Sequence, residues 1–377
     1  MTSPHLVSVN LGERSYQILV GQDLLSQTPR YLGEWLVNRN LPVPSLVLII
    51  SDPHVKRHAD LVAQALTDVG YRTETHWIPS GESAKFQATV ETCYNRLIEL
   101  KADRSTVIFA VGGGVVGDLA GFVAATYVRG IPFVQVPTTL LADVDSSVGG
   151  KTGINHPLAK NMIGAFHQPL GVLIDSATLE TLPDREFLSG LAEVVKYGVI
   201  ADAEFFAELE NHAEALRQRE PAILAKIIAV SCQRKADVVE QDEFERTGLR
   251  AILNYGHTFA HAFEALSGYG ELLHGEAVAI GMACAARLAQ KLGLIDDELV
   301  ARQDRLLSAL HLATTWPQGR EVPHAEVIDR MRLDKKSVGG QLRFILPTRL
   351  GHVQTYRNIP ETVVEEVLQD LRQRSGA

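Results

Sequence analysis

The sequence is poor in cysteine and has no paired cysteine spacing. Cys93, Cys232 and Cys284 are the three cysteines among 377 residues, and they lie far apart in the chain. This spacing excludes a disulfide framework and a thiolate zinc site. Because thiols without disulfide partners are typical of reducing compartments, a cytoplasmic protein is expected.

Long hydrophobic runs and clusters of positive charge are also lacking. The most apolar long stretch, 277–286, is too short to span a bilayer. The N-terminus has no basic region followed by an apolar core, so no signal peptide is expected. Acidic side chains number 45 against 36 basic ones, without a Lys/Arg-rich run. Neither nucleic acid nor a membrane is therefore expected as a partner, and an anionic substrate must meet local positive charge.

The first half of the chain carries the pattern of a parallel α/β fold. A hydrophobic content of 46% is that of an ordinary globular protein, and the length predicts about two domains. Short β-branched runs alternate with helical patterns, at 46–50, 55–69, 107–111, 119–127 and 133–136. This rhythm predicts strand–helix–strand units and a mostly parallel sheet.

The second half changes to long segments with helical periodicity. These segments cover 185–200, 221–239, 249–266, 275–292 and 296–310. Pro183 and the acidic residues after it resemble a helix start, which places the change near 181–184. We therefore predict an α/β domain over 1–182 and an all-α domain over 183–377.

A glycine-rich turn follows the predicted strand at 107–111. Gly112, Gly114 and Gly117 satisfy G-x-G-x-x-G, and a helix that starts there has N–H groups available for a phosphate. The acidic residue usual about 20 positions later is missing, but Asp52 ends an earlier strand and could hold ribose hydroxyls. The pattern favours nucleotide binding over a turn that merely packs a helix on a sheet.

A second glycine-rich segment, 147–152, is similar to the end of a Walker loop. That loop needs glycine at position 145, where this chain has Asp145, so a P-loop kinase or ATPase is rejected. The remaining ammonium and amide donors beside one carboxylate suit a phosphorylated polyol, and the alternative is a solvated loop. These polar residues are Asp145, Lys151, Asn155, Lys160 and Asn161.

His257, His261 and Glu264 lie on one face of a predicted helix, and His274 follows soon after. Imidazole and carboxylate together suit zinc, although the spacing leaves open which three groups bind it, or whether the face is merely polar. Glu193 and Lys196, at i and i+3, form either a helical salt bridge or a carboxylate ligand beside a cation.

Taken together, these segments resemble the 3-dehydroquinate synthase family of sugar-phosphate cyclases. The resemblance rests on 112–127, 129–130, 135–153, 160–169, 182–196, 249–261 and 274–282. It implies an N-terminal NAD-binding α/β domain, a C-terminal helical domain that binds metal and substrate, and a homodimer.

The family converts 3-deoxy-D-arabino-heptulosonate 7-phosphate to 3-dehydroquinate and phosphate in the shikimate pathway. The resemblance implies that NAD⁺ takes hydride from C5 of this sugar phosphate and later returns it. Phosphate leaves by β-elimination between these two transfers, and an intramolecular aldol reaction closes the ring.

The resemblance also implies roles for individual residues. The implied zinc ligands, which would also accept cobalt, are Glu193, His257 and His274. Implied NAD contacts are Asp52, Gly81, Glu82, Lys85, Gly113, Gly114, Val115, Val116, Gly117, Asp118, Thr138, Thr139, Lys151, Lys160, Thr178, Leu179, Glu180 and Thr181. Implied substrate contacts are Arg129, Asp145, Lys151, Asn161, Lys196, Lys235, Arg250, Asn254, His261 and one or both of Lys335 and Lys336. These two lysines, near Gly339, otherwise indicate only an exposed turn.

The chain departs from the family pattern at three places. Ala159 and Ala260 stand where the family commonly has glycine, and the chain is one residue longer around 244–247. Three alternatives remain: a sedoheptulose 7-phosphate cyclase, a metal-dependent polyol dehydrogenase that releases NADH, and a regulatory protein that binds metal and nucleotide. Asn254, His261 and the Lys335–Lys336 pair favour the heptulosonate phosphate as substrate.

Overall fold

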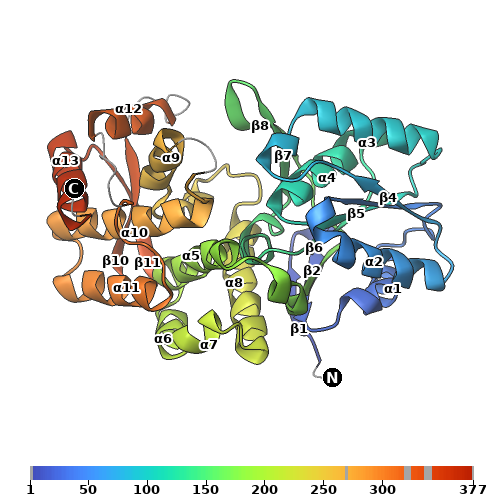
Figure 1. Ribbon diagram of the computed structural model, residues 1–377, viewed down its shortest axis with the longest axis horizontal. Coiled ribbons are helices and arrows are strands. Elements are labelled where there is room, and N and C mark those ends of the chain that lie inside the picture. Colours follow the sequence, from blue (N-terminus) through green and yellow to red (C-terminus); the bar gives the residue numbers. More distant parts are fainter. Residues whose placement is uncertain (1–2, 268–270, 318–323, 335–341, 376–377) are drawn as a thin grey trace. The chain divides into compact units, whose positions relative to one another are not determined.

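The computed structural model describes residues 3–267, 271–317, 324–334 and 342–375. The chain forms two compact units (Figure 1). Unit 1 consists of Met1–Leu182 with Leu224–Phe244, and unit 2 of Pro183–Ile223 with Glu245–Ala377. Compact packing therefore does not follow a single cut after residue 182, because residues 224–244 group with the N-terminal part.

Unit 1 is built on a seven-stranded sheet in the order β1-β2-β9-β6-β5-β3-β4. The strands are β1 (His5–Val9), β2 (Tyr16–Gly21), β3 (Val47–Ser51), β4 (Thr73–Trp77), β5 (Val107–Gly112), β6 (Phe133–Pro137) and β9 (Gly171–Asp175). Only the β1–β2 pair within this sheet is antiparallel. The predicted mostly parallel sheet is confirmed.

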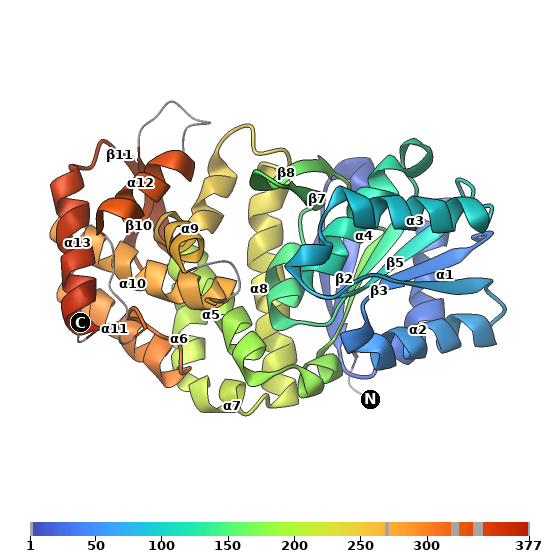
Figure 2. The ribbon, with the colours of Figure 1, turned by 45° about the horizontal axis from the view of Figure 1, so that its top comes forward.

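Helices cover both faces of this sheet (Figure 2). They are α1 (Thr28–Asn38), α2 (Lys56–Asp68), α3 (Gln87–Glu99) and α4 (Gly114–Thr126). Along β3, Val47 and Ile49 face a core shared with α1 and α2, whereas Leu48 and Ile50 face a core shared with α3 and α4. Because both faces are buried, the central strands read as continuous apolar runs without alternation.

Unit 1 also contains a two-stranded hairpin and a short π-helix. The hairpin pairs β7 (Lys151–His156) with β8 (Ala159–Phe166), and the π-helix η6 covers Ala142–Ser146. A methyl group at Gly121 of α4 would lie 2.4 Å from Thr152 Cγ2, so this glycine allows the hairpin to pack closely against the helix.

The described part of unit 2 is helical apart from one hairpin. Its helices are α5 (Asp184–Ala201), α6 (Ala203–Asn211), α7 (Ala213–Arg217), α9 (His257–Leu266), α10 (His274–Lys291), α11 (Asp297–Ala309), α12 (His324–Asp334) and α13 (Glu361–Arg374), and its hairpin joins β10 (Arg343–Arg349) and β11 (His352–Arg357). Helix α8 (Pro221–Gln241) begins in unit 2 and ends in unit 1. The predicted helical second half is confirmed, with the hairpin added.

The single helix predicted over 249–266 is wrong in one detail. A 3₁₀ helix, η8 (Leu249–Asn254), is separated from α9 by Tyr255 and Gly256, and Gly256 has φ +79°. A side chain at Gly256 would lie 2.8 Å from the backbone nitrogen of Met282, so close packing on α10 requires glycine at this break.

The apolar stretch 277–286, which lies in α10, is buried within unit 2. Among the described residues, no helix meets the length and hydropathy that a membrane crossing demands.

Candidate functional site

The residues predicted to bind a nucleotide follow neighbouring parallel strands of unit 1. Asp52 follows β3, Gly113 follows β5 and Thr138 follows β6. Strand β3 pairs with β4 on one side and with β5 on the other, so the strand order reverses at β3 and β5. Ligands of open α/β sheets bind at the carboxyl ends of strands where the order reverses.

The turn after β5 is suited to a phosphate. Gly113 is the N-cap of α4, so the first N–H groups of this helix face the end of the strand. A methyl group at Gly114 would lie 2.9 Å from Ser146 Oγ, and one at Gly117 would lie 2.7 Å from Gln135 Oε1. These glycines therefore serve close packing as well as close approach of a ligand, and the two interpretations of the motif are compatible.

Asp52 already has two protein partners. The backbone N–H of His54 donates to Asp52 Oδ1 at 2.9 Å, and the hydroxyl of Ser80 donates to the same oxygen at 2.8 Å. Both hydrogen bonds fix the side chain at the end of β3 without using Oδ2. The acid is thus held at the strand end where a ribose hydroxyl would be bound.

A buried lysine links three predicted site residues. Lys85 Nζ donates to Asp118 Oδ2 and to Asn161 Oδ1, both at 2.6 Å, and the lysine is 5% exposed. Burial raises the pKa of the Asp118 carboxyl, and the Lys85 ammonium opposes this shift. Lys85 is therefore the cation that allows a carboxylate to remain at the start of α4.

The same network holds the β7–β8 hairpin in place. The Asn155 amide donates to Glu82 Oε1 at 2.7 Å, and the backbone N–H of Asn161 donates to Asn155 Oδ1 at 2.8 Å. Gly81, with φ +84°, begins the segment that carries Glu82. Lys151 and Lys160 are exposed on this hairpin, so their side chains lie at the surface of unit 1.

The π-helix brings a predicted substrate residue to α8. Lys235 Nζ donates to Asp145 Oδ1 and to the Asp145 carbonyl, both at 2.7 Å, and Lys235 is 6% exposed. The structure thus joins two residues that the resemblance implies as substrate contacts and that lie 90 positions apart. Arg129 is exposed at the end of η5 (Tyr127–Arg129), the 3₁₀ helix that follows α4, with φ +70°.

The remaining predicted nucleotide contacts differ in burial. Thr138 and Thr178 are buried, and Leu179 is fully buried, whereas Glu180 and Thr181 are exposed after β9. The Thr178 hydroxyl donates to the carbonyl of Asp175, and Thr181 lies 3.3 Å from His58 Nε2. This segment therefore presents mainly its last two side chains to the surface.

In unit 2, three residues from three helices converge. Glu193 lies on α5, His257 at the start of α9 and His274 at the start of α10. His257 Nε2 and His274 Nε2 lie 3.5 Å and 3.4 Å from the same oxygen, Glu193 Oε1. One ligand atom from each residue lies within 4.8 Å of the others, which suits a single metal ion.

Lys196 forms an ion pair with Glu193 Oε2, and both side chains are almost fully buried. The predicted pair of Glu193 and Lys196 is therefore both a helical salt bridge and part of the cluster. Because Lys196 uses Oε2, Glu193 Oε1 is the oxygen turned to the histidines.

The two histidines have opposite electrostatic environments. Burial lowers the pKa of His257 to about 3, which favours the neutral imidazole. Burial also opposes the charge on His274, but hydrogen bonds to Glu193 and Glu264 outweigh it and raise its pKa to about 10. The two carboxylates beside His274 favour a positive charge at this place, which either a proton or a metal ion can supply. Two imidazoles and a carboxylate are a donor set for zinc, and cobalt accepts the same ligands.

The other predicted residues of unit 2 differ in their placement. The ring of His261 packs edge-on against His257 at 5.5 Å, and His261 is exposed. Arg250 is buried 3.6 Å from Glu245, and Asn254 is exposed at the end of η8. Lys335 and Lys336 lie outside the described residues.

The structure adds information about two acidic residues that the sequence does not contain. Glu264 lies 3.5 Å from His274 Nδ1. The sequence placed Glu264 on the same face of the helix as His257 but did not indicate this partner. Asp143 is fully buried, and neither of its carboxyl oxygens has a hydrogen-bond partner among the described residues. Nothing in the sequence separates Asp143 from Asp145, because only burial distinguishes them.

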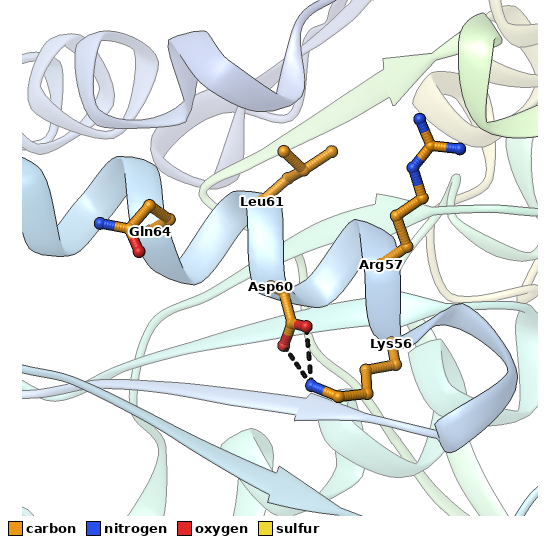
Figure 3. Close-up of a pocket in the computed structure, with 5 residues that line it drawn as sticks. All are labelled: Lys56, Arg57, Asp60, Leu61 and Gln64. Carbon is orange, nitrogen blue, oxygen red and sulfur yellow. Dashed lines mark hydrogen bonds and ion pairs between the residues drawn. The ribbon is translucent and has the colours of Figure 1, made fainter.

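A hollow of about 560 Å³ lies along α2 (Figure 3). It is lined by Lys56, Arg57, Asp60, Leu61 and Gln64, and Lys56 forms an ion pair with Asp60 at 2.7 Å. None of the residues predicted to bind cofactor, metal or substrate lines it.

Comparisons with known proteins agree in one family. Residues 75–189 match the model of the 3-dehydroquinate synthase N-terminal region, and residues 190–337 match that of the C-terminal region. The chain is 47% identical over 368 residues to a 3-dehydroquinate synthase of Synechococcus sp., covering 97% of this chain and 98% of that protein.

Solved structures of related enzymes share the fold. One is ValA, the 2-epi-5-epi-valiolone synthase of Streptomyces hygroscopicus subsp. jinggangensis 5008 with NAD⁺ and Zn²⁺ bound, with a TM-score of 0.86, 29% identity, and coverage of 97% of this chain and 99% of that one. Another is a 2-deoxy-scyllo-inosose synthase complexed with carbaglucose-6-phosphate, NAD⁺ and Co²⁺, with a TM-score of 0.83, 26% identity, and coverage of 97% and 100%.

Proposed function

Because the chain belongs to the 3-dehydroquinate synthase family, we propose that it converts 3-deoxy-D-arabino-heptulosonate 7-phosphate to 3-dehydroquinate and phosphate. The observation that carries this proposal is the convergence of Glu193, His257 and His274 in a chain whose relatives of that name match nearly its full length. A carbon–oxygen lyase of the shikimate pathway is the activity that these two facts support together.

The proposed cofactors are NAD and a zinc or cobalt ion. When bound, NAD⁺ takes and returns hydride at C5 of the substrate, and the metal ion acts as a Lewis acid on substrate hydroxyls. Glu193, His257 and His274 would hold the metal. The segments after β3, β5, β6 and β9 would hold NAD, with Lys85 and Asp118 fixed beside the glycine turn. The structures of ValA and of 2-deoxy-scyllo-inosose synthase, with NAD⁺ and a metal ion, support this assignment.

The chain's own polar residues would bind and orient the sugar phosphate. Arg129 and Arg250 suit the carboxylate and phosphate, because a guanidinium donates two parallel hydrogen bonds to such groups. Other ammonium, amide and imidazole groups would contact phosphate and hydroxyl oxygens. By holding the substrate in one geometry, these contacts would contribute more to the rate than any single reactive group. These residues are Lys151, Asn161, Lys196, Lys235, Asn254, His261, Lys335 and Lys336, with Asp145 held by Lys235.

The division of labour along the chain is part of the same proposal. Residues 1–182 would bind NAD, and residues 183–377 would bind metal and most of the substrate. We further propose a homodimer that works in the cytoplasm on a small sugar phosphate. Three buried thiols without disulfides are consistent with a reducing compartment.

Phosphate release tests the proposed reaction. The purified protein with NAD⁺ and zinc is offered the heptulosonate phosphate and sedoheptulose 7-phosphate in parallel, while NADH absorbance is followed. We expect phosphate only from the heptulosonate phosphate and no accumulating NADH. Release only from sedoheptulose 7-phosphate would move the chain to the other cyclases, and steadily rising NADH would indicate a polyol dehydrogenase.

The metal ligands are tested by His257→Ala. Because this change removes one of three ligands, we expect bound zinc below about a tenth of an ion per chain and turnover reduced at least about a thousandfold. His311→Asn is the control, since His311 is exposed in unit 2 with φ +58° and Asn accepts that backbone conformation. Unchanged metal content and turnover in His257→Ala would refute the ligand set.

A further inference from the structure

The two imidazoles of the metal cluster are oriented in the same way. Each turns Nε2 toward Glu193 Oε1, at 3.5 Å for His257 and 3.4 Å for His274. Each Nδ1 faces an oxygen on the opposite side. His257 Nδ1 lies 3.1 Å from the carbonyl of Tyr255, and His274 Nδ1 lies 3.5 Å from Glu264 Oε2.

This arrangement decides which nitrogen is available as a ligand. A neutral imidazole has one N–H and one lone pair, so a ring that donates from Nδ1 has its lone pair on Nε2. Both oxygens opposite Nδ1 are acceptors. With a metal ion at Nε2, each ring would keep its single proton on Nδ1, where one of these oxygens accepts a hydrogen bond from it.

The two acceptors differ in origin. Tyr255 uses a backbone carbonyl two residues before His257, which any side chain at 255 would supply. Glu264 reaches from the third turn of α9 to the first residue of α10, two helices that pack against each other. Its side chain is 18% exposed, so the carboxylate lies mostly inside unit 2 rather than on a solvated face.

We propose that Glu264 is a positioning residue of the metal site, which accepts a hydrogen bond from Nδ1–H of His274 and so fixes Nε2 of that ring as the ligand atom. This inference rests on the proposed metal ligands. Carboxylates in this position hold the ring of a metal-binding histidine and increase its basicity. This role accounts for Glu264, the one residue of the helix face of His257, His261 and Glu264 to which the resemblance gave no role.

The test measures zinc affinity by competition with a chelator. Removal of such a carboxylate typically weakens metal binding about 10- to 100-fold, so we expect this loss for Glu264→Ala. Glu264→Gln keeps an oxygen that accepts the hydrogen bond but lacks the charge. We therefore expect a smaller loss of zinc affinity, about 3- to 10-fold. Glu365→Gln, which removes one exposed charge elsewhere in unit 2, should bind zinc within about twofold of the unsubstituted protein.

A second readout separates positioning from a general loss of structure. In histidine-labelled, zinc-loaded protein, the Nδ1–H resonance of His274 should persist in Glu264→Gln and disappear by exchange with water in Glu264→Ala. Thermal unfolding of the zinc-free variants should show one cooperative transition, lowered by a few degrees in Glu264→Ala because the contact with His274 is lost.

The outcomes distinguish this inference from the proposed function. Zinc affinity of Glu264→Ala within twofold of the unsubstituted protein would overturn the role of Glu264 alone. If Glu264→Ala does not fold, unchanged affinity in Glu264→Gln would overturn it equally. If the unsubstituted protein binds no zinc, the proposed metal site fails and the role of Glu264 fails with it.

Discussion

The two units assemble their polar clusters in different ways. In unit 1 the candidate residues follow successive strands, and a parallel sheet brings the ends of its strands to one edge whatever side chains they carry. In unit 2 Glu193, His257 and His274 come from three helices, and nothing gathers them except close packing of those helices. A site made by sheet topology should therefore tolerate packing changes that a site made by helix contacts does not.

Gly275→Ala attacks the helix contact directly and should have the largest effect. A methyl group there would lie 1.8 Å from the carbonyl oxygen of Ser189, so α10 and α5 must move apart. These helices carry His274 and Glu193. Because this movement displaces two metal ligands relative to each other, we expect zinc affinity to fall by about 100-fold, measured by chelator competition.

The matched control is Gly33→Ala in α1, where a methyl group meets nothing within 4 Å. Zinc affinity should not change there, and the helix should gain slight stability. Full zinc affinity in Gly275→Ala would break the comparison, because the cluster of unit 2 would then not depend on close packing.

Lys85→Met tests the polar network of unit 1. The change leaves the Asp118 carboxylate mostly buried without its ammonium partner, so we expect a loss of about 3 kcal/mol in the free energy of unfolding. Adding Asp118→Asn should restore more than half of this loss, since no uncompensated charge then remains. Urea unfolding of the two variants measures both values, and an equal loss in the single and double variants would contradict the charge argument.

Asp143→Asn tests a buried group of unit 1 outside that network. Burial, with a like charge from Asp175, raises the pKa of the Asp143 carboxyl well above its ordinary value. The folded protein therefore holds a proton that the unfolded chain releases. Stability from this group is complete below the unfolded pKa, about 3.9, and is lost as pH rises through the folded pKa.

Asparagine does not titrate, so the free energy of unfolding of the variant should rise relative to that of the unsubstituted protein as pH rises. The gain should approach about 1.4 kcal/mol per pH unit above pH 4, until the folded pKa is reached. Unfolding midpoints at pH 4.5 and pH 7.5 measure it. A difference that does not grow with pH would mean that Asp143 is ionised in the folded protein.

Ala260→Gly should have the smallest effect. Ala260 is fully buried in α9. Glycine in a helix interior costs about 1 kcal/mol relative to alanine, so the unfolding temperature should fall by a few degrees. Turnover should remain within about twofold, and a larger change would mean that this methyl group shapes the cluster beside it.

Sequence reasoning predicted many elements of both units well because strand and helix patterns are local. The strand at 107–111 and the glycine turn after it occur as expected, and 275–292 nearly coincides with α10. The break at Gly256 escaped prediction because it depends on a contact with Met282, far along the chain.

The candidate site was less accessible from residue patterns alone. His257, His261 and Glu264 share a face of α9, but spacing cannot tell that Glu193 and His274 approach that face from other helices. The resemblance to a family supplied those partners, and the structure brings them together. Neither spacing nor composition could indicate that Lys235 would pair with Asp145, or that Asp143 would be buried beside it.

The route of helix α8 has a consequence for how the chain folds during synthesis. The first 182 residues leave the ribosome before the last part of unit 1 exists, because residues 224–244 follow some forty residues of unit 2. Lys235, the partner of Asp145, is therefore synthesised 90 residues after it. Unit 1 cannot be completed as a single nascent segment, so a pause or truncation between residues 182 and 224 leaves its π-helix without the lysine that neutralises it.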